Sequence, residues 1–189
     1  MENSDFLKVN EVRLLDSGLN WTGCSKEQWN QALAAMVGRL EGYGPSGTRF
    51  LLAFGCNSLL DLLVRTAAQH LGFVPVTMNW QADTPQVFEY KLEKTRARFV
   101  VVHESCPASI RALILSDDFS PQVLEVTESM LSERGSVLPP LEGSSSATAL
   151  TLFTSGTTGV PKGVELSTQA YDSNLDIFRL FLDLKPDEP

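Results

Sequence analysis

The chain has 189 residues, of which 43% are hydrophobic and 20% are charged, so it can form one domain with a substantial core. Its 23 acidic and 15 basic side chains give a net charge of -8, which disfavours nucleic acid as a partner because phosphate backbones would be repelled. The three cysteines lack metal-ligand spacing and only two histidines accompany them, which argues against a structural zinc site. The first ten residues do not resemble a signal peptide and no run is long enough to span a membrane, so we expect a cytoplasmic protein.

The first predicted element is an amphipathic helix over residues 25–44. Apolar side chains recur at helical spacing from Trp29 to Leu40, and glycines follow the last of them. Ser25 and Gln28 have the spacing of a capping box, in which each side chain hydrogen-bonds the other residue's backbone N–H.

Short apolar strands then alternate with amphipathic helices. The predicted order is strand 49–54, helix 57–70, strand 73–78, helix 84–98 and strand 98–103. Asn57 or Ser58 is the expected cap of the first of these helices, and Thr84 followed by Pro85 begins the second. Apolar strands separated by such helices are typical of a sheet buried on both sides. We therefore predict an α/β fold whose mostly parallel sheet is flanked by helices on both faces.

The middle of the chain is less regular. "ALIL" (112–115) and "QVLEV" (122–126) predict two short strands. Residues rich in Gly, Pro and Ser follow and are typical of a linker. We accordingly divide the chain into a first α/β subdomain portion over 1–134, a linker over 135–148, and a strand-loop-strand unit with a following helix over 149–189.

The last part contains the most informative loop. Strands are predicted over 147–154 and 164–167, a helix is predicted from Thr168 onward, and "SGTTGVPKG" joins the two strands. Its glycines allow conformations in which consecutive backbone N–H groups form a concave anion site. Hydroxyl side chains add hydrogen-bond donors, and Lys162 supplies one positive charge. The pattern fits a polyphosphate.

Two common nucleotide motifs are absent. A Walker loop requires Gly-Lys-Ser/Thr opening onto a helix, whereas here Lys162 follows Pro161 and precedes a strand. A Gly-x-Gly-x-x-Gly dinucleotide fingerprint after a strand is also missing. P-loop hydrolases and dehydrogenases are therefore weak candidates.

The stretch "LTLFTSGTTGVPKGVELS" (150–167) resembles the phosphate-loop signature of the adenylate-forming superfamily, which includes acyl-CoA synthetases, luciferases and the adenylation domains of peptide synthetases. The residues match at every defining position over 154–159 and 161–163. Residues 71–102 are similar, more softly, to a strand, helix and strand of the family's first subdomain. The resemblance thus covers nearly the whole chain and implies the N-terminal portion of an AMP-binding domain.

The resemblance implies a role for each loop residue. The residues that would enclose the β- and γ-phosphates of ATP are Thr154, Ser155, Gly156, Thr157, Thr158 and Gly159. Lys162 would bind the same phosphates and act as the catalytic residue of this chain. The implied reaction activates a carboxylic acid to an acyl-adenylate with Mg²⁺ and ATP, and CoA or a carrier thiol then takes the acyl group.

The chain lacks other parts of the family's machinery. The family's aromatic adenine motif, ribose-binding aspartate and C-terminal lysine cannot be found after Ser167, where about twenty residues remain. We therefore expect a truncated chain that is not a competent enzyme alone. Two other interpretations stay open, a non-catalytic fragment that binds nucleotide or a partner through an exposed apolar face, and a Gly- and Thr-rich hairpin without ligand.

Overall fold

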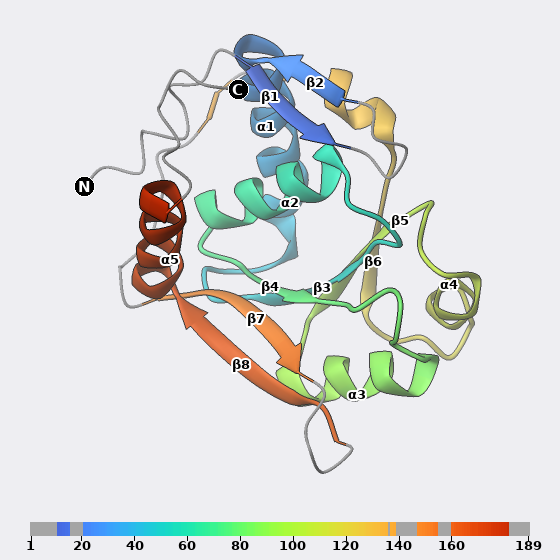
Figure 1. Cartoon of the computed structure of the whole chain (residues 1–189). Coiled ribbons are helices and arrows are strands. Elements are labelled where there is room, and N and C mark those ends of the chain that lie inside the picture. Colours follow the sequence, from blue (N-terminus) through green and yellow to red (C-terminus); the bar gives the residue numbers. More distant parts are fainter. Residues whose placement is uncertain (1–10, 16–20, 136, 139–146, 155–159, 182–189) are drawn as a thin grey trace.

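A computed structural model describes residues 11–15, 21–135, 137–138, 147–154 and 160–181 (Figure 1). The strands are β1 (Glu11–Leu15), β2 (Trp21–Ser25), β3 (Arg49–Ala53), β4 (Val74–Thr77), β5 (Phe99–His103), β6 (Gln122–Val126), β7 (Thr148–Thr154) and β8 (Lys162–Ser167). The helices are α1 (Lys26–Leu40), α2 (Leu59–His70), α3 (Pro85–Thr95), α4 (Ala108–Ile114) and α5 (Thr168–Phe181), with short 3₁₀ turns η2 (Glu41–Tyr43) and η3 (Glu128–Ser132).

A six-stranded sheet forms the centre of the molecule, in the order β6-β5-β3-β4-β7-β8. Every neighbouring pair is parallel except β7–β8, which is antiparallel. The predicted α/β fold with a mostly parallel sheet is confirmed. β7 pairs with β4 at Val76 and Thr151, so the strand after the predicted linker continues the same sheet as the strands before it.

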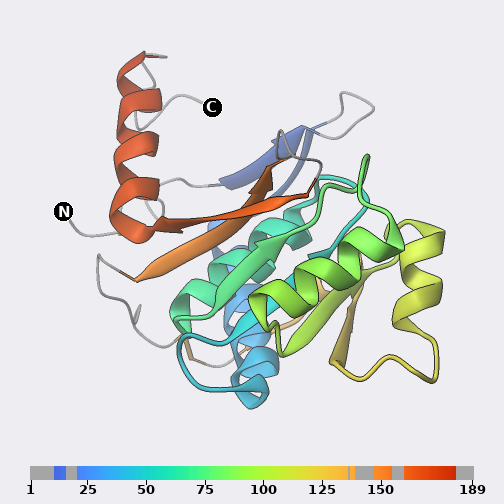
Figure 2. The same cartoon turned by 90° about the horizontal axis from the view of Figure 1, so that it is seen from below.

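Helices cover both faces of this sheet, as predicted (Figure 2). On one face, α1 and α2 pack on Phe50, Leu52 and Phe99 in a buried cluster. On the other face, α3 and α4 pack on Leu51 and Val100 in a second cluster. The continuous apolar strands are therefore explained, since successive side chains of each strand enter opposite layers.

The helix starts follow from local sequence. Ser25 caps α1 with the predicted capping box to Gln28. Ser58, one of the two residues proposed, caps α2 by accepting a hydrogen bond from the Asp61 N–H. Thr84 caps α3 and Pro85 occupies its first turn, where the missing N–H is tolerated.

Two features differ from the sequence-based expectation. "ALIL" lies within and just after α4 and is not a strand, because Ile110 and Ile114 are one helical turn apart and are both buried. "QVLEV" is β6, as predicted. The antiparallel pair of β1 and β2 was not predicted.

Candidate functional site

The predicted phosphate loop is the connection between β7 and β8. These strands pair antiparallel, and the last pair in the register before the loop joins Thr154 to Lys162. Both ends of the predicted motif are therefore brought together. Ser155, Gly156, Thr157, Thr158 and Gly159 lie outside the described residues.

Thr154 and Lys162 share one face of the hairpin. Directly opposite residues of an antiparallel pair project to the same side, with Cβ atoms about 4.5–5.5 Å apart. Both residues are exposed, and the Lys162 ammonium has no ion-pair partner within the described part of the chain. A hydroxyl and an unpaired cation thus stand side by side at the base of the loop, where an anion can reach both.

The next pair along the hairpin, Phe153 and Gly163, projects to the opposite face and packs toward α3. A Cβ placed on Gly163 would lie 3.3 Å from Cζ of Phe153, so the glycine leaves room for the ring. The ring centroid of Phe153 lies 6.4 Å from that of Tyr90 at an interplanar angle of 75° and 5.1 Å from Nζ of Lys91. Both partners belong to α3.

The carboxyl ends of the parallel strands offer a second possible place for a ligand. Ligands of open α/β sheets commonly bind where neighbouring strands send their connections to opposite faces. In this sheet one such point lies between β3, which leads to α2, and β5, which leads to α4. The two loops instead contact each other, since the Gly55 N–H donates to Ser105 Oγ at 3.0 Å. A Cβ on Gly55 would lie only 1.9 Å from the Ser105 carbonyl oxygen, so these loops close the crevice between them.

His103 belongs to this closed junction and acts as a packed residue. Its side chain is buried, stacks on Phe54 at 5.0 Å, and its Nδ1 accepts a hydrogen bond from the Ser105 N–H. Its Nε2 lies 3.5 Å from a Glu128 carboxylate oxygen.

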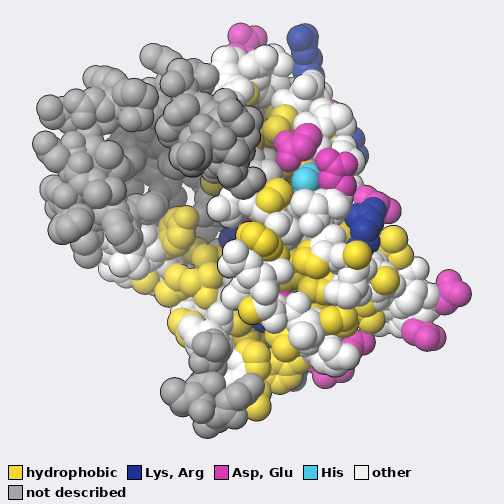
Figure 3. Space-filling model, turned by 45° about the vertical axis from the view of Figure 1, so that its right-hand side comes forward, with side chains coloured by type: hydrophobic (Ala, Val, Ile, Leu, Met, Phe, Trp, Pro, Cys, Tyr) yellow, Lys and Arg dark blue, Asp and Glu magenta, His cyan; other side chains and the backbone are white. Residues whose placement is uncertain are grey.

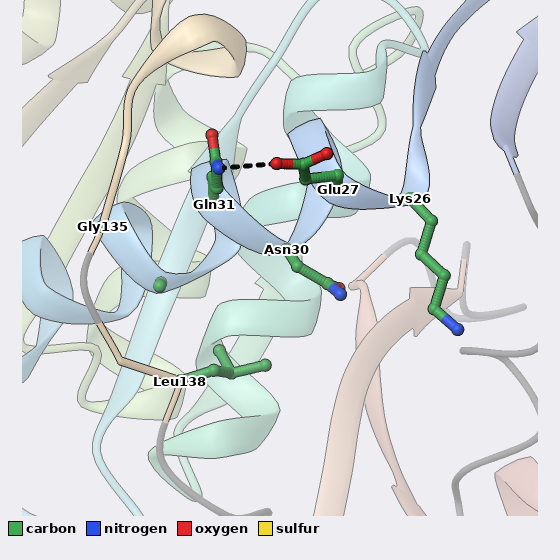
Figure 4. Close-up of a pocket in the computed structure, with 7 residues that line it drawn as sticks. Lys26, Glu27, Asn30, Gln31, Gly135 and Leu138 are labelled. Carbon is green, nitrogen blue, oxygen red and sulfur yellow. Dashed lines mark hydrogen bonds between the residues drawn. The ribbon is translucent and has the colours of Figure 1, made fainter.

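Two cavities of the described structure are lined by residues other than the ends of the hairpin loop. The larger one, of about 510 Å³, lies between α1 and the segment of Gly135 and Leu138 (Figure 4). A smaller one, of about 240 Å³, lies at the carboxyl ends of β3 and β4, beside Trp80. Neither cavity is lined by Thr154 or Lys162.

Positive charge is scattered over the described surface and forms no broad patch on the face seen in Figure 3. On the face shown in Figure 3, lysine and arginine side chains lie separately among hydrophobic and acidic ones. Attraction for a phosphate therefore depends on specific groups rather than on a broad positive field. Among the described residues, no cluster of three or more His, Cys, Asp or Glu could hold a metal ion, and no helix has the length and apolar character needed to cross a membrane.

Comparison with known proteins places the chain in a family. The family model described as AMP-binding enzyme matches residues 24–186. The chain belongs to the AMP-binding enzyme family. Among curated relatives, the hybrid PKS-NRPS synthetase gkaA of Penicillium citrinum is 30% identical over 168 residues, which cover 88% of this chain and 4% of that protein.

Solved structures share the fold. The adenylation domain of a keto acid-selecting NRPS module, bound to a keto acyl adenylate, superposes with a TM-score of 0.75 at 16% identity and covers 96% of this chain. ATP-bound MatB from Rhodopseudomonas palustris superposes with a TM-score of 0.71 at 21% identity and covers 88% of this chain. This chain spans 34% of each of those two structures.

Sequence reasoning missed the residues of α3 that contact the hairpin. Tyr90 and Lys91 carry no motif, and their role depends on how α3 packs beside β7 and β8. One signal was available, because Lys91 lies three residues after the buried Phe88 and so falls on the same face of the helix. A lysine on an apolar helix face needs a partner, and that partner is Asp83.

Proposed function

We propose that this chain provides the phosphate-binding part of an enzyme that activates a carboxylic acid with ATP to an acyl-adenylate. The observation that carries the proposal is the pairing of Thr154 with Lys162 at the base of the loop, with both side chains exposed on one face. Membership of the AMP-binding enzyme family and the printed descriptions of the relatives support it. Because the chain spans about a third of those solved structures, the activity is a property we assign to the whole enzyme.

In the proposed reaction, a carboxylate oxygen attacks the α-phosphorus of ATP and forms the acyl–phosphate bond. The bond from the α-phosphorus to the bridging oxygen breaks, and pyrophosphate leaves with the electron pair. The hydroxyls of Ser155, Thr157 and Thr158 orient the pyrophosphate, and Lys162 offsets its growing negative charge. Gly156 and Gly159 let the backbone N–H groups approach the phosphate oxygens.

Mg²⁺ fits this arrangement as an ion carried by the triphosphate. Among the described residues, the Thr154 hydroxyl beside Lys162 would be the oxygen available to such an ion, since Mg²⁺ prefers hard oxygen ligands. The ion would neutralise phosphate charge. Thr154 would hold its side of the bound phosphates while Lys162 holds the other.

We further propose that a thiol takes the acyl group from the adenylate, with CoA as the acceptor and a carrier-protein thiol as the alternative. CoA ligases and peptide-synthetase adenylation domains both occur among the relatives. The thiolate attacks the acyl carbonyl carbon, a thioester forms, and AMP leaves. We expect the 189 residues alone to bind nucleotide but not to complete this chemistry.

The experiment measures MgATP binding by calorimetry and ATP–pyrophosphate exchange with a panel of carboxylic acids. We expect binding by the 189-residue chain and exchange only in a longer form that continues past Pro189. Lys162→Ala and Gly156→Ala should slow exchange sharply while the thermal midpoint stays close to wild type. Lys94→Ala, which removes an exposed lysine of α3, is the matched control.

Three results would contradict the proposal. Wild-type exchange rates in both loop variants would remove the phosphate role of the loop. Exchange by the 189 residues alone would overturn the requirement for further sequence. Binding of a protein partner without any affinity for MgATP would favour the non-catalytic interpretation.

A further inference from the structure

Helix α3 contacts both strands of the hairpin at the base of the phosphate loop. The Tyr90 hydroxyl donates a hydrogen bond of 3.2 Å to the carbonyl oxygen of Pro161, the residue immediately before Lys162. The ring of Phe153, the residue immediately before Thr154, lies against Tyr90 and Lys91. Two adjacent residues of one helix thus contact the neighbours of both phosphate-binding ends.

The hydrogen bond from Tyr90 acts on the orientation of Lys162. The Pro161 carbonyl and the Lys162 N–H belong to one planar peptide group, so fixing the oxygen also fixes the plane from which Lys162 departs. The proline ring restricts φ of residue 161, which leaves ψ as the main free rotation on that side. The Tyr90 hydroxyl therefore constrains the rotation that decides where the Lys162 side chain leaves the strand.

A buried ion pair and a hydrogen bond join α3 to the turn after β4 and to β4 itself. The Lys91 ammonium lies 2.5 Å from Oδ2 of Asp83 and donates a second hydrogen bond to the carbonyl of Thr77, the last residue of β4. The side chains of this ion pair are 2% and 7% exposed. β4, which accepts this hydrogen bond, is also the strand that pairs with β7 of the hairpin.

We propose that Tyr90 is a positioning residue, which holds the Pro161–Lys162 peptide so that the Lys162 ammonium is presented to a bound polyphosphate. The inference rests on the proposed function, since it assigns Tyr90 to the same phosphate site. Tyr90 acts through Lys162 and does not contact the phosphates. The ring of Phe153 packs against Tyr90 and Lys91 and so holds the end of β7 next to Thr154.

The test uses Tyr90→Phe in the full chain, because this change keeps the ring against Phe153 and removes only the hydroxyl. Calorimetry measures binding of MgATP and of pyrophosphate. We expect Tyr90→Phe to weaken both roughly three- to ten-fold, the range expected for one lost hydrogen bond. The thermal midpoint should stay within about two degrees of wild type. Tyr43→Phe, whose ring packs on Phe99 away from the hairpin, is the matched control and should bind as wild type.

A double-variant comparison separates positioning from a general structural role. In a Lys162→Ala background, Tyr90→Phe should cause no further loss of affinity, because the residue through which it acts is gone. A ligand-free readout is the amide resonance of Lys162 in an NMR spectrum of the 20.7 kDa chain. It should move in Tyr90→Phe and stay in place in Tyr43→Phe.

The outcomes distinguish this inference from the proposed function. No binding by the wild type would overturn both. Binding by the wild type, weakened by Lys162→Ala but unchanged by Tyr90→Phe, would overturn the role of Tyr90 alone. Equal loss from Tyr90→Phe in both backgrounds would show that the tyrosine does not act through Lys162, and would also overturn it.

Discussion

The side chains of Lys91 and Asp83 form a salt bridge inside the protein, with Nζ 2.5 Å from Oδ2. The turn after β4 supplies the carboxylate, and the Asn79 N–H donates a further hydrogen bond to it at 2.9 Å. The Thr77 carbonyl accepts from the ammonium at 3.3 Å. Both charges are therefore satisfied by fixed partners, and loss of one would leave the other buried without compensation.

Asp83→Ala should lower the free energy of unfolding by about 3–5 kcal/mol, because the Lys91 charge would remain buried and unpaired. Urea unfolding measures this. Glu165→Ala is the control, since its salt bridge with Arg49 at 2.7 Å has side chains 50% and 36% exposed. Its loss should cost no more than about 1 kcal/mol. Equal effects of the two variants would contradict the importance of burial for the Lys91 pair.

Gly55→Ala and Gly38→Ala should change stability in opposite directions. The new Cβ at residue 55 would lie 1.9 Å from the Ser105 carbonyl oxygen, so the β3–α2 and β5–α4 loops would have to move apart. Gly55→Ala should therefore lower the free energy of unfolding by about 1–3 kcal/mol. Gly38 is solvent-exposed in the middle of α1, and a Cβ there meets nothing within 4 Å. Gly38→Ala should therefore raise the free energy of unfolding by about 0.5–1 kcal/mol. Thermal unfolding checks both, and destabilisation by Gly38→Ala would be the unexpected result.

Ser105→Ala should destabilise the junction between the same two loops by about 1–3 kcal/mol. The serine hydroxyl accepts from the Gly55 N–H at 3.0 Å and lies 2.7 Å from Nδ1 of His103, so its removal leaves a partly buried N–H without its partner. Chemical unfolding measures the loss. Ser129→Ala removes an exposed hydroxyl and should stay within about 0.5 kcal/mol of wild type.

Cys106 should resist alkylation at pH 8. Burial raises the pKa of its thiol to about 11, an effect partly opposed by the nearby Arg111, so little reactive thiolate is present. Site-resolved mass spectrometry after a pulse of iodoacetamide gives the rate, and Cys56, which is less buried, serves as the internal comparison. Faster labelling of Cys106 than of Cys56 would contradict this.

The same thiol makes stability depend on alkaline pH. Its pKa is higher in the folded state than the ordinary value of 9.0, so the unfolded chain loses the proton first as pH rises. The contribution of Cys106 is thus complete below pH 9 and is lost between about pH 9 and pH 11. Cys106→Ala should remove this part of the pH dependence in denaturant titrations, and an unchanged alkaline slope would refute it.

Much of the fold was predictable because its signals are local. The caps at Ser25 and Thr84, the buried strand β5 and the helical spacing of α2 each appear within a short window of sequence. The run "ALIL" was misassigned because four consecutive apolar residues fit a buried helix as well as a buried strand. The packing of Ile110 and Ile114, one helical turn apart, shows that it belongs to a helix. The pairing of β1 with β2 depends on register between two segments without a strong apolar pattern.

The candidate site was predictable only where a motif exists. Thr154 and Lys162 were identified from the sequence, and the hairpin register brings them together. Tyr90 lies 71 residues from Pro161 in sequence, and only the packing of α3 beside the hairpin makes them neighbours.

The hairpin of β7 and β8 pairs with the parallel strands over a short stretch of β4. In the described residues, the register between β4 and β7 consists of Val76 with Thr151, whereas β3 and β5 are joined at four positions. Local unfolding of β7 and β8 as a unit should therefore need less free energy than unfolding of the β3–β5–β6 core. Amide hydrogens of β8 should exchange with deuterium well before those of β5. The hairpin that we propose to bind the nucleotide should therefore unfold locally while the other strands of the sheet stay folded.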